Sequence, residues 1–255
     1  MPFVPDSVST TVRIAAIGDF HYSRASQGAV LPLLSRVHED ADVLVLCGDL
    51  TDYGLPEEAS LLARDLQTAV RIPMVGVLGN HDYESGQQDD VARILREAGV
   101  QILDGDTTEI SGVGFAGVKG FGGGFGRGVL GAWGETVIKQ FVNEAIAEAL
   151  KLESALARLR MPARIAVLHY APVRDTVEGE PLEIFPYLGC SRLEEPLTRY
   201  PVSAVVHGHA HHGAPEGRTS NGTPVYNVSL PLMREAAPDR PYRIVTVETS
   251  MEVPT

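Results

Sequence analysis

Short apolar runs that end in glycine followed by an acidic or amide residue place the strongest constraint on the fold of this chain. Residues 12–17, 43–47 and 73–78 are rich in aliphatic and β-branched side chains, and they end at Gly-Asp, Gly-Asp and Gly-Asn. Between them, residues 31–38 and 56–70 carry apolar side chains at intervals of three and four, as amphipathic helices do. This alternation of strands and helices predicts parallel crossovers, and therefore an α/β arrangement for the first half of the chain.

The rest of the chain predicts a longer helix and further short strands. A helix is expected over residues 87–98, and a long amphipathic helix over residues 137–159. Strands are expected around Ile102, around Ile110, and over residues 113–118, 164–168, 202–206, 225–228 and 242–247. Because no repeat or low-complexity segment divides the chain, we expect a single domain over residues 1–255, with its motif-bearing core in residues 12–230.

Charge and cysteine content exclude several classes of protein. Asp and Glu number 33 against 21 Lys and Arg, so the net charge is −12, which disfavours an extended nucleic acid or an anionic membrane as partner. The chain has no apolar run of about 18 residues, and no basic residue precedes Arg13, so we expect neither a membrane span nor a secretory signal, and a cytoplasmic location. Cys47 and Cys190 are too few for a disulfide framework or a thiolate zinc site.

The predicted strand ends gather residue types that bind metals. Open α/β sheets present their sites at the carboxyl ends of strands. Within Asp19-x-His21 and within His209-x-His211, both side chains face the same way along an extended segment. Carboxylates and imidazoles without thiolates favour Mn, Fe, Zn or Co over Ca or Mg. The residues concerned are Asp19, His21, Asp49, Asp52, Asn80, His81, Asp82, His169, His207, His209 and His211.

Each cluster alone also has an ordinary explanation. A single histidine near a strand end is commonly a hydrogen-bonded structural residue, Asn80 can be a turn residue after Gly79, and Asp82 can be a cap. Taken together, the clusters favour a metal site, because buried Asp and His side chains without partners carry a desolvation cost that bound cations remove.

The order and spacing of these blocks resemble the calcineurin-like metallophosphoesterase family. The blocks are Asp19-x-His21, Gly48-Asp49-Leu50-Thr51-Asp52, Gly79-Asn80-His81-Asp82, His169 and Gly208-His209-Ala210-His211. The resemblance implies a two-sheet β-sandwich flanked by helices, classed as α/β or, in some schemes, α+β. It also implies two divalent or trivalent metal ions (Mn, Fe or Zn), bridged by Asp49. The first would be held by Asp19, His21, Asp49 and His211, and the second by Asp49, Asn80, His169 and His209.

The resemblance also implies a reaction. A hydroxide that bridges the two metals would attack phosphorus, because two cations lower the pKa of a shared water and offset the charge that develops on the phosphate. His81, which has no metal role in the family pattern, would donate a proton to the leaving group, and Asp52 would orient His81 and stabilise its charge. Asn80 would contact the substrate as well as a metal, because a neutral amide does not repel a phosphate.

The substrate expected from the sequence is a small phosphodiester or a nucleotide. In the phosphoprotein phosphatase branch of the family Arg-Gly follows the second-block Asp, whereas here Tyr53-Gly54 follows Asp52, which disfavours a protein phosphatase. The alternatives are a phosphomonoesterase, a nuclease, or a metal-binding scaffold without turnover. The sequence does not indicate the oligomeric state.

A glycine-rich segment, residues 112–134, holds 11 of the 26 glycines. Its ordinary interpretation is a mobile loop or hairpin tip. The functional alternative is that Arg127 contacts a substrate phosphate while Phe121, Phe125 or Trp133 stacks on a base. Tyr170 and Tyr187 are likewise open to interpretation as packing residues or substrate contacts. We expect residues 174–187 to form a surface excursion.

Overall fold

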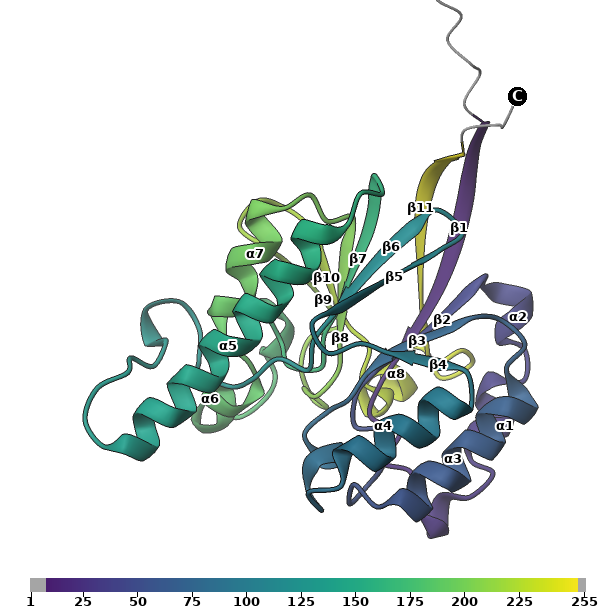
Figure 1. Cartoon of the computed structure of the whole chain (residues 1–255), viewed down its shortest axis with the longest axis horizontal. Helices are drawn as coiled ribbons and strands as arrows, with labels where there is room; N and C mark the ends of the chain where they lie inside the picture. Colours follow the sequence, from purple (N-terminus) through teal and green to yellow (C-terminus); the bar gives the residue numbers. More distant parts are fainter. Residues whose placement is uncertain (1–7, 252–255) are drawn as a thin grey trace, which may run out of the picture.

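Two β-sheets lie face to face in the computed structural model, which describes residues 8–251, and helices cover their outer sides (Figure 1). The expectation of no secretory signal rests partly on residues 1–7. These residues lie outside the described part of the chain. In spatial order, the first sheet consists of β11 (Arg243–Met251), β1 (Val8–Ile17), β2 (Val43–Cys47), β3 (Met74–Val77) and β4 (Val100–Ile102). The second consists of β5 (Asp106–Ile110), β6 (Val113–Gly117), β7 (Ala163–Val167), β8 (Ala204–His207), β10 (Pro224–Asn227) and β9 (Glu216–Arg218). The two-sheet arrangement flanked by helices confirms the expected fold class.

The interior of each sheet is parallel. β1, β2, β3 and β4 run in one direction, and so do β6, β7, β8 and β10. Within the described residues, antiparallel strands lie only at the edges of the two sheets, where β11 pairs with β1, β5 with β6 and β9 with β10. In each sheet the parallel strands therefore all finish at the same end of the sheet, and the polar blocks of the sequence follow there.

Both faces of the central strands are buried, which explains why these strands appear in the sequence as continuous apolar runs. Along β1, Ile14 and Ala16 pack into the core between the two sheets, whereas Ala15 and Ile17 pack under the helices of the first sheet. A third core lies under the helices of the second sheet and includes Leu152 and Leu156. The molecule thus has four layers: helices, sheet, sheet and helices.

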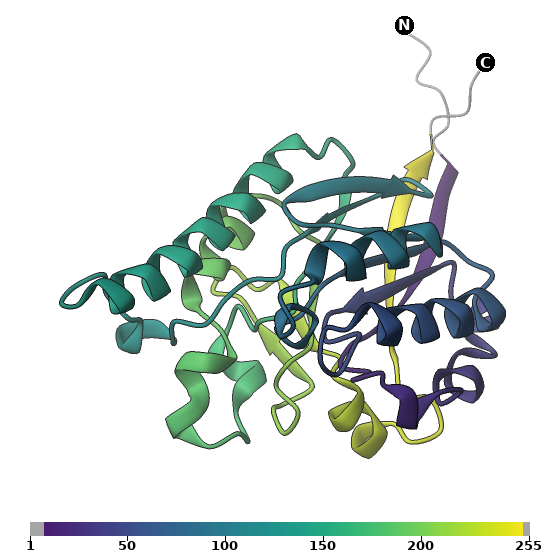
Figure 2. The ribbon, with the colours of Figure 1, turned by 60° about the horizontal axis from the view of Figure 1, so that its bottom comes forward.

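The helices divide between the two outer faces. In Figures 1 and 2 the long α5 lies on the side of the second sheet, away from α3 and α4. None of the helices in residues 8–251 is both long enough and apolar enough to cross a membrane. The helices are α1 (Val30–Leu34), α2 (Val37–Asp40), α3 (Pro56–Ala69), α4 (Gln88–Glu97), α5 (Thr136–Arg158), α6 (Phe185–Leu188), α7 (Glu194–Arg199) and α8 (Leu230–Ala236). Short 3-10 turns are η1 (Arg24–Ser26), η2 (His81–Tyr83), η3 (Gly126–Gly128), η4 (Arg174–Val177), η5 (Leu182–Ile184) and η6 (Ser191–Leu193).

The structure departs from the expected elements mainly in short segments. The helix expected over residues 31–38 is divided into α1 and α2, and at the break the Ser35 hydroxyl donates to the Pro32 carbonyl, a local bond that competes with the helix. Within the excursion expected over residues 174–187, Thr176 and Val177 are buried, so part of this segment belongs to the packed body of the protein. β9, α6, α7 and α8 were not predicted.

Part of the glycine-rich segment is packed closely rather than extended into solvent. The Gly123 N–H donates to the Pro186 carbonyl at 2.6 Å, and the Gly124 N–H donates to the Gly189 carbonyl at 2.9 Å. A Cβ atom on Gly122 would meet the Pro186 carbonyl oxygen. Close approach of two backbones therefore requires glycine here, which the interpretation as a mobile loop did not anticipate.

Candidate metal centre

Hydrogen bonds between strand ends hold the polar blocks together. The Gly18 N–H, after β1, donates to the Val228 carbonyl at 2.9 Å, and the Gly208 N–H, after β8, donates to the His169 carbonyl at 3.2 Å. The first of these bonds joins the two sheets, and polar side chains that follow five different strands meet at one place. Within the described residues, three groups of potential ligands form there, each with its ligand atoms within 4.8 Å of one another, and two of the groups consist of predicted metal ligands.

The first group consists of Asp19, His21 and His211. His211 Nε2 lies 3.1 Å from Asp19 Oδ1 and 3.4 Å from His21 Nε2. Asp19 is buried, and its carboxylate also accepts the His209 N–H, at 2.9 Å from Oδ1. Residues from both sheets therefore form this group.

The second group consists of Asp49, His169 and His209, with Asn80 beside them. His169 Nε2 lies 3.4 Å from Asp49 Oδ1 and 2.9 Å from Asn80 Oδ1. The other carboxylate oxygen, Asp49 Oδ2, lies 3.8 Å from His21 Nε2 of the first group. The two oxygens of Asp49 thus face one group each, the arrangement that a bridging carboxylate needs.

Main-chain carbonyls fix how two of these imidazoles present their nitrogens. His169 Nδ1 lies 2.9 Å from the Cys47 carbonyl oxygen, and His209 Nε2 lies 3.0 Å from the Tyr187 carbonyl oxygen. A carbonyl only accepts, so each of these nitrogens carries the proton and the other nitrogen of a neutral ring keeps a lone pair for a cation. A neutral His169 would direct this lone pair toward the oxygens of Asp49 and Asn80, where a bound cation would be stabilised.

The charges of the site also favour positive charge next to its carboxylates. Burial alone lowers the pKa of His169, but attraction by Asp49 and a hydrogen bond to it prevail and raise the pKa to about 9. Burial also lowers the pKa of His209, to about 4. Among residues 8–251, no lysine or arginine forms an ion pair with Asp19 or Asp49, whose only ion-pair partners are histidines. Two buried carboxylates surrounded by imidazole nitrogens fit a pair of metal cations.

Backbone strain is concentrated at the same residues. Within the described chain, five non-glycine residues have a positive φ, and four of them are predicted ligands: Asp19 at 59°, His21 at 44°, Asp49 at 48° and His209 at 71°. Such conformations cost on the order of 1–3 kcal/mol each and persist where the surrounding structure imposes them, commonly at functional sites. These left-handed conformations also show that Asp19, His21 and His209 do not lie in the extended conformation expected from the sequence.

His81 and Asp52 lie beside the first group. The His81 ring lies edge-on to the His21 ring, with centroids 4.5 Å apart, and its side chain is 35% exposed. We expected the Asp52 carboxylate to orient His81, but His81 Nδ1 instead donates to the main-chain carbonyl of Asp52 at 2.7 Å. The Asp52 carboxylate lies 3.5 Å from His21 Nδ1, because the Asp52 N–H is bonded to the Tyr22 carbonyl and this places the side chain next to His21.

Comparison with known families agrees with this geometry. The family described as calcineurin-like phosphoesterase matches residues 12–213. The chain belongs to this family. Members of the calcineurin-like phosphoesterase family hydrolyse phosphoesters with the help of metal ions, and the two ligand groups are where this chain would bind them. No curated protein matches the sequence.

Solved structures share the fold at low sequence identity. Phosphopantetheinyl hydrolase (PptH) from Mycobacterium tuberculosis has a TM-score of 0.63 and 18% identity, over 91% of this chain and 95% of that one. TT1561 of Thermus thermophilus has a TM-score of 0.53 and 16% identity, over 93% and 99%. A putative 5'-nucleotidase from Staphylococcus aureus has a TM-score of 0.51 and 15% identity, over 86% of this chain and 48% of that one. At these sequence identities the comparison shows only that these proteins share a fold with this chain.

Two glycines in the sequence blocks that carry the predicted ligands are required because a ligand carboxylate passes close to each of them. A Cβ atom on Gly79 would collide with Oδ1 of Asp49, and one on Gly208 would collide with Oδ2 of Asp19. Neither glycine has a positive φ, so the close passage of a ligand carboxylate, and not the backbone conformation, excludes a side chain there.

Asp82, which the sequence left ambiguous, ties two ligand-bearing loops of the phosphoesterase together. Its buried carboxylate accepts the N–H of Thr51 at 2.8 Å and its hydroxyl at 2.6 Å, and the N–H groups of Leu50 at 3.2 Å and Gly79 at 2.8 Å. Burial and the charge of Asp49 raise the pKa of Asp82 to about 6, while the bonds from Gly79 and Thr51 act in the opposite direction. Asp82 is therefore a positioning residue for the segments that carry Asp49 and Asn80.

Replacing Asp82 with Asn should destabilise the phosphoesterase without removing a metal ligand. The amide cannot accept all four hydrogen bonds, and each buried donor left without an acceptor costs about 1–3 kcal/mol, so we expect Tm to fall by roughly 5–10 °C. Thermal unfolding followed by circular dichroism measures this. Asp239→Asn, which removes the same charge at an exposed position, is the matched control and should change Tm by less than about 2 °C. Equal Tm values for the two variants would contradict the role of Asp82.

The remaining sequence candidates differ in how close they come to the site. Arg127 is exposed in η3 and forms no hydrogen bond or ion pair with the ligand groups in the described part of the chain, so its contact with a phosphate stays a prediction. Trp133 is exposed, and Phe125 packs near Phe185. Phe121, by contrast, lines a hollow beside Asn80 and His209, together with Phe141, which was not predicted as a site residue.

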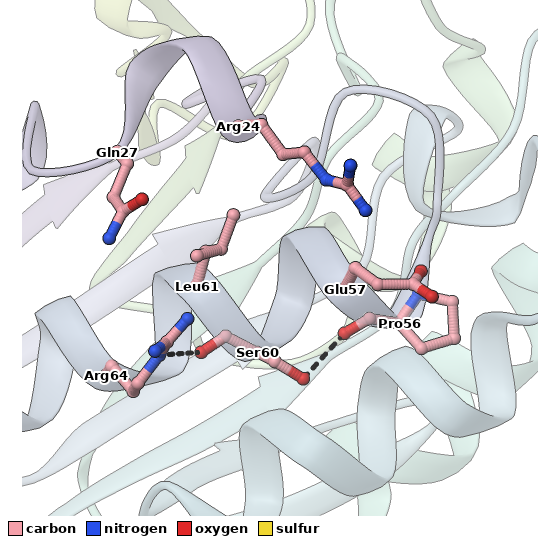
Figure 3. Close-up of a pocket in the computed structure, with 7 residues that line it drawn as sticks. All are labelled: Arg24, Gln27, Pro56, Glu57, Ser60, Leu61 and Arg64. Carbon is pink, nitrogen blue, oxygen red and sulfur yellow. Dashed lines mark hydrogen bonds between the residues drawn. The ribbon is translucent and has the colours of Figure 1, made fainter.

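A larger hollow, of about 540 Å³, lies between η1 and α3 (Figure 3). The hydrogen bonds drawn in Figure 3 stay within α3: the Ser60 hydroxyl donates to the Pro56 carbonyl at 2.8 Å, and Arg64 Nε donates to the Ser60 carbonyl at 3.3 Å. No candidate metal ligand lines this hollow, so its size does not make it the reactive site.

Proposed function

We propose that this protein is a phosphodiesterase that hydrolyses a small phosphodiester or a nucleotide with the help of two metal ions. The observation that carries the proposal is the position of Asp49, whose two carboxylate oxygens face the two ligand groups. When bound, two cations would activate a water and offset the charge that develops on the phosphate. Asp19, His21, Asp49 and His211 would hold one of them, and Asp49, Asn80, His169 and His209 the other.

The residues of the chain account for the rest of the reaction. Water adds to phosphorus, the bond from phosphorus to the leaving oxygen breaks, and that oxygen takes up a proton, so a diester yields an alcohol and a monoester. His81 would donate this proton from Nε2 as an imidazolium, while its Nδ1–H stays bonded to the Asp52 carbonyl, and the partly exposed ring would take up a replacement proton from solvent. Asn80 offers an uncharged amide next to His169, so it can bind both a metal and a phosphate oxygen without repelling the substrate.

Charge and fold support a small substrate. The net charge of −12 disfavours a long nucleic acid, whose binding requires many basic contacts. Two proteins of similar fold are described as a phosphopantetheinyl hydrolase and a putative 5'-nucleotidase.

The proposal is tested with bis(p-nitrophenyl) phosphate as the diester and p-nitrophenyl phosphate as the monoester. We expect chelation to abolish nitrophenol release, added Mn²⁺, Fe²⁺ or Zn²⁺ to restore it, and the diester to have the larger kcat/KM. A larger kcat/KM for the monoester would make the protein a phosphomonoesterase instead. Two bound metal ions with no turnover of either ester would make it a metal-binding scaffold.

A further inference from the structure

A hollow of about 250 Å³ adjoins the second ligand group. Two of the residues that line it, Asn80 and His209, belong to that group, and its other side chains are aromatic: Phe121, Phe141, Tyr170 and Tyr187. In the described part of the chain, no lysine, arginine, aspartate or glutamate lines it. A phosphoester bound at the metal centre would therefore have an apolar, ring-lined space next to its phosphate.

The four aromatic rings form a continuous wall, although they come from separate parts of the chain. The centroid of Phe121 lies 4.9 Å from that of Phe141 and 5.8 Å from that of Tyr170. Phe141 in turn lies 6.2 Å from Tyr187, and the Tyr170 ring lies 4.5 Å from the His209 ring. These separations are those of interacting aromatic pairs, so the wall is connected to the ligand group through ring contacts.

A buried lysine holds this wall in place. Lys119 Nζ lies 4.9 Å from the ring centroid of Phe121 and 5.3 Å from that of Tyr170, and it donates a hydrogen bond to the Gly120 carbonyl at 2.8 Å. Lys119 does not line the hollow, so its ammonium group supports the rings without introducing charge into the space. The main-chain carbonyl of Tyr187 accepts a hydrogen bond from His209, and the residue as a whole is 63% exposed. Phe121 and Tyr170 are thus held in place before a ligand arrives, which lowers the entropic cost of binding.

We propose that this hollow is a subsite for one aromatic ring system carried by the phosphoester substrate. Its volume is below the range of about 300–1,000 Å³ found for drug-sized ligands, which favours a single flat ring system. Aromatic faces attract such a ring by stacking, and the described lining contains no lysine or arginine that would bind a second phosphate.

The ring belongs to the ester group that stays on phosphorus. His81, which under the proposed function protonates the leaving oxygen, lies against His21 and Asp52, and it does not line the hollow. A substituent in the hollow therefore lies away from the proton donor. This assignment rests on the proposed function and specifies its substrate as an aryl or nucleobase-containing diester.

Two diesters with the same leaving group test the subsite: phenyl p-nitrophenyl phosphate and methyl p-nitrophenyl phosphate. We expect the phenyl ester to have a kcat/KM about tenfold larger or more, as a stacked ring would give. Phe141→Leu and Tyr187→Leu keep apolar volume but remove a ring face, and each should reduce the phenyl-to-methyl ratio by about fivefold or more. Phe125→Leu, in the same glycine-rich segment as Phe121 but outside the hollow, is the matched control and should leave the ratio unchanged.

The ratio separates recognition of the ring from general damage to the enzyme. An unchanged ratio in Phe141→Leu and Tyr187→Leu, including a parallel loss of both rates, would overturn the subsite. If the wild-type protein binds metals but turns over neither ester, the proposed function fails, and the subsite is then tested by calorimetry with phenylphosphonate and methylphosphonate. Tighter binding of phenylphosphonate that is lost in Phe141→Leu would support the hollow on its own, and equal binding would overturn it.

Discussion

In the Asp49→Asn variant we expect kcat/KM for bis(p-nitrophenyl) phosphate to fall by about 10³-fold or more, because the metal ions would supply several kcal/mol of transition-state stabilisation. Asp49 is 1% exposed, and its two oxygens lie 3.4 Å from His169 Nε2 and 3.8 Å from His21 Nε2. An amide in its place has one oxygen and no negative charge, so it cannot serve both ligand groups. We therefore also expect fewer than two bound metal ions per chain, measured by inductively coupled plasma mass spectrometry after dialysis.

Asp42→Asn is the matched control for this loss. Asp42 precedes β2 while Asp49 follows it, and Asp42 forms a partly exposed ion pair with Arg13 at 2.9 Å, worth about 1 kcal/mol or less. This variant should keep both metal ions and full activity. If Asp49→Asn also retained two ions and the wild-type rate, Asp49 would not bridge the two groups, and the assignment of the centre would have to be abandoned.

The sequence predicted the elements whose burial leaves a periodic pattern. The bounds of β2 agree residue for residue, and those of α3 and α5 agree to within one residue, because a parallel strand buried on both faces and a long helix buried on one face leave unambiguous patterns. The ligand groups could be predicted for a related reason: each ligand follows a strand, and parallel strands bring their carboxyl ends to one edge.

Contacts between segments distant in the sequence could not be predicted. Whether the carboxylate or the carbonyl of Asp52 orients His81 depends on a hydrogen bond to Tyr22, which belongs to another strand end. The four donors gathered by Asp82 come from two loops, and the wall around Phe121 draws its rings from separate parts of the chain. Short elements such as β9 contain too few residues to show a period.

His81→Ala should lower the rate without removing the metal ions. Transfer of a proton by a positioned histidine contributes typically about 10²–10⁴-fold, and this contribution is largest when the leaving group is a poor one. We therefore expect a loss of about 10²-fold or more for an alkyl diester such as a nucleotide methyl ester, followed by ³¹P NMR. The loss should be clearly smaller for bis(p-nitrophenyl) phosphate, because nitrophenolate leaves without protonation. His38→Ala, which removes an exposed histidine on α2, should leave both rates unchanged.

The metal content of His81→Ala decides between two roles for this histidine. Ligand atoms of His21, Asp52 and His81 lie within 4.8 Å of one another, so this trio could also hold a cation. The Asp52 carbonyl fixes a proton on Nδ1, as the Cys47 carbonyl does for His169, so this hydrogen bond is compatible with both roles and the metal content decides between them. A proton donor leaves the metal content at two ions when it is removed, whereas a ligand does not. Loss of metal in His81→Ala, with equal rate losses for the alkyl and nitrophenyl esters, would reassign His81 as a ligand.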